Sequence, residues 1–100
     1  MNMQDAIILP LGSIVILKEE NRKIMIISRG TVFYDSQNNK DTFAEYVGVP
    51  YPDGFDSKVT TFFSNDDIAS IVNRGYSDQD ETEFLNLYKM WRNDMKLKYE

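Results

Sequence analysis

The sequence contains neither cysteine nor histidine. Without cysteine there is no disulfide, no thiolate nucleophile and no cysteine-based zinc site, and a small chain of this kind suits a reducing compartment. Without histidine the chain also lacks the commonest general base and the commonest metal ligand. We therefore expect no catalytic residues, no cofactor and no bound metal, and we predict that the protein is not an enzyme.

Long apolar runs are missing as well. No run approaches the length that crosses a membrane. Residues 1–5 carry no positive charge and the apolar residues 6–9 are too few for a secretory signal. The sequence therefore predicts a cytoplasmic protein.

Basic residues are outnumbered, with 11 Lys and Arg against 16 Asp and Glu and a formal net charge of −5. The excess lies in residues 31–70, where two lysines stand among seven acidic residues. This distribution disfavours nucleic acid or an anionic membrane as the partner.

What the chain does contain is enough apolar material for a core. With 100 residues and 42% hydrophobic residues, we predict a single domain over residues 1–100. Two β-branched runs, residues 13–17 and 24–27, flank a charged link and predict a hairpin. Neither run alternates cleanly, so both faces should become covered. Ile7, Ile8 and Leu9 should dock on this sheet.

Strand character continues beyond the hairpin. Arg29-Gly30 either ends the second strand or interrupts it with a bulge. Residues 31–34, 42–49 and 59–63 are strand-like, separated by a polar turn at 35–41 and a Pro/Gly loop starting at residue 50. The alternation in 42–49 does not decide which face is buried. The predicted sheet spans about residues 7–63.

Two helices are predicted after the sheet. Ser64 and Asp67 have the form of a capping box, and Ile68, Ile71 and Val72 follow at helical spacing, which predicts a short helix over about 65–74. A longer helix over about 78–98 carries the stripe Phe84, Leu87, Tyr88, Trp91 and Met95. We interpret this stripe as core, with an exposed partner face as the alternative.

These elements predict an α+β fold, a mainly antiparallel twisted sheet of about four or five strands covered by the C-terminal helix. A sheet curled into a small barrel is compatible with the same pattern.

Acidic clusters have structural explanations. Asp66 and Asp67 are adjacent and do not face each other on a helix, so capping explains them better than catalysis. An EF-hand loop starting at Asp78 would need glycine at Glu83 and glutamate at Lys89, and neither is present.

The loop over residues 51–58 is the candidate binding site. It sets Tyr51 and Phe55 around Pro52, Asp53 and Gly54. Aromatic side chains in a stiffened loop are suited to the centre of an interface. We predict that Tyr51, Asp53 and Phe55 bind a partner; the alternative is that the rings fold back onto the sheet.

Several motifs, in order, resemble one family. They are LPLGSIV at 9–15, KIMIISR at 23–29, EYVGV at 45–49 with YPDG at 51–54, FF at 62–63 with DDI at 66–68, and GYSD at 75–78. They resemble a family of small Gram-positive bacterial proteins of uncharacterised domain type, often encoded beside type VII secretion genes and LXG-type toxins. The resemblance implies a cytoplasmic accessory protein, an adaptor or chaperone, that binds a toxin or another secretion substrate. An immunity protein and a small-barrel nucleic-acid binder are the alternatives, and neither the toxin nor the oligomeric state is specified.

Overall fold

The computed structural model describes residues 7–99, which form an antiparallel sheet of five strands followed by one long helix. In chain order the elements are β1 (Ile14–Leu17), β2 (Lys23–Asp35), β3 (Lys40–Pro50), β4 (Thr61–Phe63), a 3-10 helix (Asn65–Asp67), β5 (Ile68–Asn73) and α1 (Gln79–Lys98). The strands lie in the order β4-β3-β2-β1-β5, and the sheet is not closed into a barrel. The predicted α+β class, mainly antiparallel and with a C-terminal helix, is confirmed.

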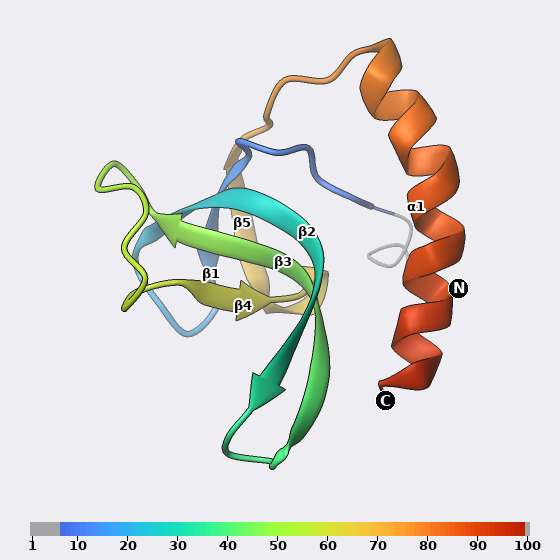
Figure 1. Cartoon of the computed structure of the whole chain (residues 1–100). Helices are drawn as coiled ribbons and strands as arrows, with labels where there is room; N and C mark the ends of the chain where they lie inside the picture. Colours follow the sequence, from blue (N-terminus) through green and yellow to red (C-terminus); the bar gives the residue numbers. More distant parts are fainter. Residues whose placement is uncertain (1–6, 100) are drawn as a thin grey trace.

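β2 and β3 form the longest hairpin and bend strongly along their length (Figure 1). The ladder shifts register between Ile26 and Ser28, and Gly30 takes a φ of +70° a few residues later. β2 therefore does not end at Arg29-Gly30 but continues to Asp35. The bend turns the far end of the hairpin away from β1 and β5 (Figure 1).

The predicted short helix over about 65–74 is wrong. The capping interactions exist, since Asp67 Oδ2 accepts hydrogen bonds from the Ser64 backbone N–H at 2.9 Å and from its hydroxyl at 3.2 Å. However, they cap only the single 3-10 turn, and Ile68–Asn73 is the strand β5. β1 offers an unpaired edge to this β-branched segment, and pairing such as Val15 with Ile71 outweighs the weak local helical preference.

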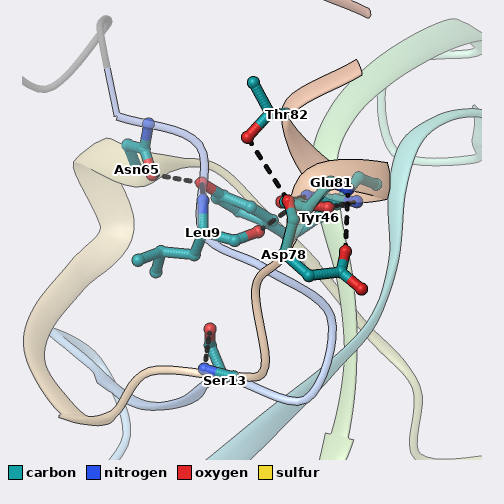
Figure 2. Close-up of polar contacts among 9 residues, drawn as sticks. Leu9, Ser13, Tyr46, Asn65, Asp78, Glu81 and Thr82 are labelled. Carbon is teal, nitrogen blue, oxygen red and sulfur yellow. Dashed lines mark hydrogen bonds and ion pairs between the residues drawn. The ribbon is translucent and has the colours of Figure 1, made fainter. Parts of the chain in front are cut away.

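The core lies between the sheet and the N-terminal segment. Its buried members are Leu9, Val15, Leu17, Ile24, Ile26, Tyr46 and Phe63, with Ile7 packed against them. The expected docking of the N-terminal segment on the sheet is therefore confirmed for Ile7 and Leu9. Tyr46 anchors this segment through its hydroxyl, which accepts a hydrogen bond from the Leu9 N–H at 3.0 Å and donates one to Asn65 Oδ1 at 2.7 Å (Figure 2).

β3 is buried on both faces. Residues 44–50 are all buried. The alternation in the sequence did not decide which face of this strand is buried, and in the structure both faces are. Tyr46 belongs to the core, whereas Glu45 contacts Arg92 of α1. The two-sided cover explains why this strand mixes apolar and polar residues without a clean period.

Candidate protein-binding surface

The predicted binding residues Tyr51, Asp53 and Phe55 lie in the β3–β4 loop. The loop starts from a firm anchor, because the Tyr51 N–H donates to the Lys23 carbonyl at 2.9 Å and the Gly54 N–H donates to the Pro50 carbonyl at 2.8 Å. The Tyr51-Pro52 peptide bond is cis and Gly54 has a φ of +87°, a conformation that favours glycine. The loop is thus held in one defined turn.

Both aromatic rings of this loop face solvent. Phe55 is 71% exposed and Tyr51 is 42% exposed, with Lys23 Nζ lying 6.0 Å from the Tyr51 ring centroid. Neither ring is part of the buried core. The alternative, in which the rings fold back onto the sheet as part of the core, therefore does not apply. Asp53 forms an exposed ion pair with Arg22 of the neighbouring β1–β2 turn, which leaves its carboxylate partly neutralised.

A second surface is formed where α1 meets β2 at Gly30. A Cβ at this position would lie 2.5 Å from Trp91 Cζ3 and 2.7 Å from Tyr88 Cε1. The two rings therefore rest directly on the bare backbone of β2. Glycine here serves both the positive φ and the close approach of the helix.

Aromatic rings continue this junction along α1. Phe84 stacks on Tyr88 with centroids 5.3 Å apart, Tyr88 is 5.8 Å from Trp91, and Trp91 meets Phe43 of β3 edge-on at 5.8 Å. Such pairs stabilise beyond the area they bury. They hold one side of the helix in a fixed position against the β2–β3 hairpin.

Two buried ion pairs fix the same helix. Near its start, Arg29 of β2 binds Glu81 through two hydrogen bonds of 2.5 and 2.8 Å, and its guanidinium lies 4.6 Å from the Phe84 ring centroid. Further along, Glu45 Oε2 lies 3.4 Å from an Arg92 nitrogen and 3.5 Å from Lys96 Nζ. Two-point attachment of this kind sets both the rotation and the height of α1 on the sheet.

The N-terminus of α1 is capped by a side chain. Asp78 caps it, because its carboxylate accepts a hydrogen bond from the Glu81 N–H at 3.2 Å and its carbonyl accepts one from the Thr82 hydroxyl at 3.3 Å (Figure 2). The preceding segment is tied to the sheet, since the Gly75 N–H donates to the Ser13 hydroxyl at 2.9 Å (Figure 2). The helix therefore starts at a defined point.

Only part of the predicted α1 stripe is core. Tyr88 is buried, but Leu87 is 76% exposed, and Phe84 and Trp91 are 43% and 40% exposed. We define the apolar flank as five exposed apolar residues of the helix, of which Met90 and Leu97 lie outside the predicted stripe: Phe84, Leu87, Met90, Trp91 and Leu97. The spacing predicted Phe84, Leu87 and Trp91 correctly as one apolar row, but it could not tell how narrow the contact with the sheet is.

The apolar flank borders an open cavity of about 340 Å³. Its lining consists of Arg29, Gly30, Phe84, Leu87, Tyr88 and Trp91. Gly30 lines it from β2, and the rings of Phe84, Tyr88 and Trp91 line it from α1. This arrangement can receive a bulky apolar group from outside.

The lining of the cavity includes one buried phenol, the side chain of Tyr88. Burial raises the pKa of Tyr88 to about 12 from 10.0, and the Glu45 carboxylate raises it further in the same direction. The Tyr88 hydroxyl has no hydrogen-bond partner among residues 7–99. It stays neutral at physiological pH, so the cavity carries no negative charge of its own from this group.

Two features are absent from the described residues. Among residues 7–99 no three carboxylates gather where a metal ion would bind. Within the same range, no helical segment combines the length and the apolar character that crossing a membrane requires. The β3–β4 loop and the apolar flank both expose apolar side chains and are the candidate binding surfaces.

The comparisons with known proteins give a family and no function. The profile of the family described as Domain of unknown function (DUF4176) matches residues 8–84, which include the five strands and the first turns of α1. No curated protein and no solved structure is significantly similar to this chain. Because the match covers well over half of its length, the chain belongs to the DUF4176 family of domains of unknown function.

Proposed function

We propose that this protein is a non-enzymatic accessory protein, an adaptor or chaperone, that binds a toxin or another substrate of type VII secretion in the cytoplasm of a Gram-positive bacterium. The observation that carries the proposal is the apolar flank, a set of exposed large apolar side chains on a helix that buried ion pairs hold in place. Contiguous apolar surface on a soluble domain marks a protein interaction site.

The nature of the partner rests on two further arguments. The chain is acidic, with a net charge of −5, which disfavours nucleic acid and anionic lipid and favours a protein with a basic face. The link to type VII secretion rests on the resemblance of the ordered sequence motifs. The β3–β4 loop, with Tyr51, Asp53 and Phe55, is the second surface available to the same partner.

The test is a capture experiment with an LXG-type toxin of a type VII secretion system, the partner that the sequence resemblance implies. The targeting region and the toxic domain are produced separately and passed over the immobilised full chain. Capture of the targeting region supports the adaptor, whereas capture of the toxic domain alone identifies an immunity protein instead. Capture of neither fragment contradicts both.

The nucleic-acid alternative is tested on the same sample. A single-stranded oligonucleotide that binds with a steep loss of affinity between low and physiological salt would replace the proposal with a nucleic-acid-binding function. Because the surface is acidic, we expect no such binding.

A further inference from the structure

We infer that the apolar flank binds one amphipathic α-helix of the partner, a helix whose apolar stripe is bordered by lysine and arginine. The inference deepens the proposed function and rests on it for the claim that the partner is a protein. It assigns the main contact to α1 and not to the β3–β4 loop, and it states which secondary structure and which charge the partner presents.

The pattern along α1 supports a helical occupant. Spacings of three and four residues place six side chains on one outward stripe: Asp80, Glu83, Leu87, Met90, Asp94 and Leu97. Phe84, Trp91 and Lys98 run beside it at spacings of seven. Apolar positions repeated in this way match the repeat of a second helix lying alongside.

The cavity beside Gly30 supplies an anchor point. Leu87 and Trp91 contribute to its lining, and it has a volume of about 340 Å³ with a mainly apolar surface. A leucine or aromatic side chain from the partner helix fits such a space. Buried anchors of this kind usually carry most of the binding energy of an interface.

A second cavity, of about 310 Å³, lies towards the start of α1 and shares Arg29 and Phe84 with the first. Asp78, Asp80 and Glu81 contribute to its lining. Because Glu81 is already paired with Arg29, the remaining acidic charge at this cavity comes from Asp78 and Asp80. A basic side chain next to the apolar anchor of the partner would meet these carboxylates.

Charge also distinguishes between possible helical occupants. The outward stripe and the row beside it contain three carboxylates, Asp80, Glu83 and Asp94, and one base, Lys98. A second copy of this chain would bring two acidic surfaces together, which is unfavourable. A helix bordered by basic residues is complementary, so the partner helix is basic.

An extended strand is a poor fit for this surface. The backbone groups of α1 in the middle of the helix are already hydrogen-bonded within it and offer no ladder to a strand. Strand addition needs an open sheet edge, and the apolar flank lies on the helix. The side chains of the apolar flank are therefore what the partner contacts.

The experiment uses the full chain and two synthetic amphipathic helices of the same length as α1. Both probes carry leucine and one aromatic residue on the apolar face; one has lysine borders and the other glutamate borders. Binding is measured by calorimetry at physiological salt. We expect the lysine probe to bind at least tenfold more tightly than the glutamate probe.

Matched variants locate the contact. Leu87→Glu introduces one charge on the apolar flank, and Phe55→Glu introduces the same charge on the β3–β4 loop; both side chains are more than 70% exposed, so both variants should fold. We expect Leu87→Glu to weaken the affinity for the lysine probe at least tenfold. Phe55→Glu should change the same affinity less than twofold. Glu83→Lys with Asp94→Lys should reverse the preference between the two probes.

The outcomes decide the inference separately from the proposed function. Equal binding of both probes, or equal loss in the two glutamate variants, overturns it. So does a dimer in sedimentation experiments that Leu87→Glu dissociates, because the occupant would then be a second copy. A chain that binds the lysine probe through the apolar flank but captures no toxin fragment retains the inference and loses the proposed function.

Discussion

Gly30→Ala tests whether the seating of α1 on β2 is what holds the helix in place. The new Cβ would lie 2.5 Å from the Trp91 ring and 2.7 Å from the Tyr88 ring, both far inside van der Waals contact. Relieving the overlap costs about 1–3 kcal/mol. Alanine at a φ of +70° adds about 1–2 kcal/mol.

The expected loss is therefore about 2–5 kcal/mol, out of about 5–15 kcal/mol for a domain of ordinary stability. Gly54→Ala is the matched control, because Gly54 has a similar φ of +87° and nothing lies within 4 Å of the added Cβ. Gly54→Ala therefore has the free-energy cost of alanine at a positive φ but not the cost of a steric overlap. The difference between the two variants isolates the contact with α1.

The assay is urea unfolding followed by circular dichroism and by tryptophan fluorescence. Trp91 is the only tryptophan in the sequence, so its emission reports directly on the junction. We expect Gly30→Ala to shift the emission to the red and Gly54→Ala to leave it unchanged. If both variants lose the same stability and keep the same emission, α1 does not rest on Gly30 and the description of the junction is wrong.

Three further predictions concern single groups. Glu45→Ala should lower the free energy of unfolding by about 1.5–3 kcal/mol, because it removes a buried carboxylate and its charge-assisted contact with Arg92, whereas Arg22→Ala at an exposed pair should cost less than about 1 kcal/mol in the same urea assay. The folded pKa of Tyr88, about 12, exceeds the unfolded value of 10.0, so the stability from this group is fully present below pH 10 and is lost as the pH rises from about 10 to about 12. By pH 11 the free energy of unfolding should be about 1 kcal/mol lower than at pH 8, as measured by urea unfolding curves at the two pH values. Tyr88→Phe should make this difference smaller, and an unchanged difference would mean that another group titrates. The double change Tyr51→Ala, Phe55→Ala should leave circular dichroism and the melting temperature nearly unchanged, because both rings are exposed, and a fall in capture of a toxin fragment by about 2 kcal/mol or more would make the β3–β4 loop a principal contact.

Much of the fold could be predicted from the sequence where the local signals and the tertiary structure agree. The hairpin of residues 13–27 and the C-terminal helix follow from β-branched runs and a helical apolar period. β5 could not be predicted this way, because its strand conformation depends on the open edge of β1. The local pattern at Ile68, Ile71 and Val72 fits one and a half helical turns equally well.

The candidate site shows the same division. The β3–β4 loop was predicted from its own residues, and the structure places Tyr51 and Phe55 at the surface. An exposed face on α1 was only the alternative interpretation of its stripe, because the stripe gives the direction of the apolar side chains but not the width of the contact. That width is set by Gly30, Arg29 and Glu45, three residues on strands far away in the sequence. A glycine inside a strand pattern was the one local signal of a close approach there.

The position of β1 between β2 and β5 has a consequence for how the chain is made. β1 pairs with β2 soon after both are synthesised, but its other edge stays open until Ile68–Asn73 has left the ribosome. During that interval the nascent chain exposes an apolar strand edge, which is a site for unwanted pairing with other chains. Fragments that stop before residue 68 keep the edge of β1 open permanently, so we expect them to aggregate more than the full chain, in which β5 pairs with β1.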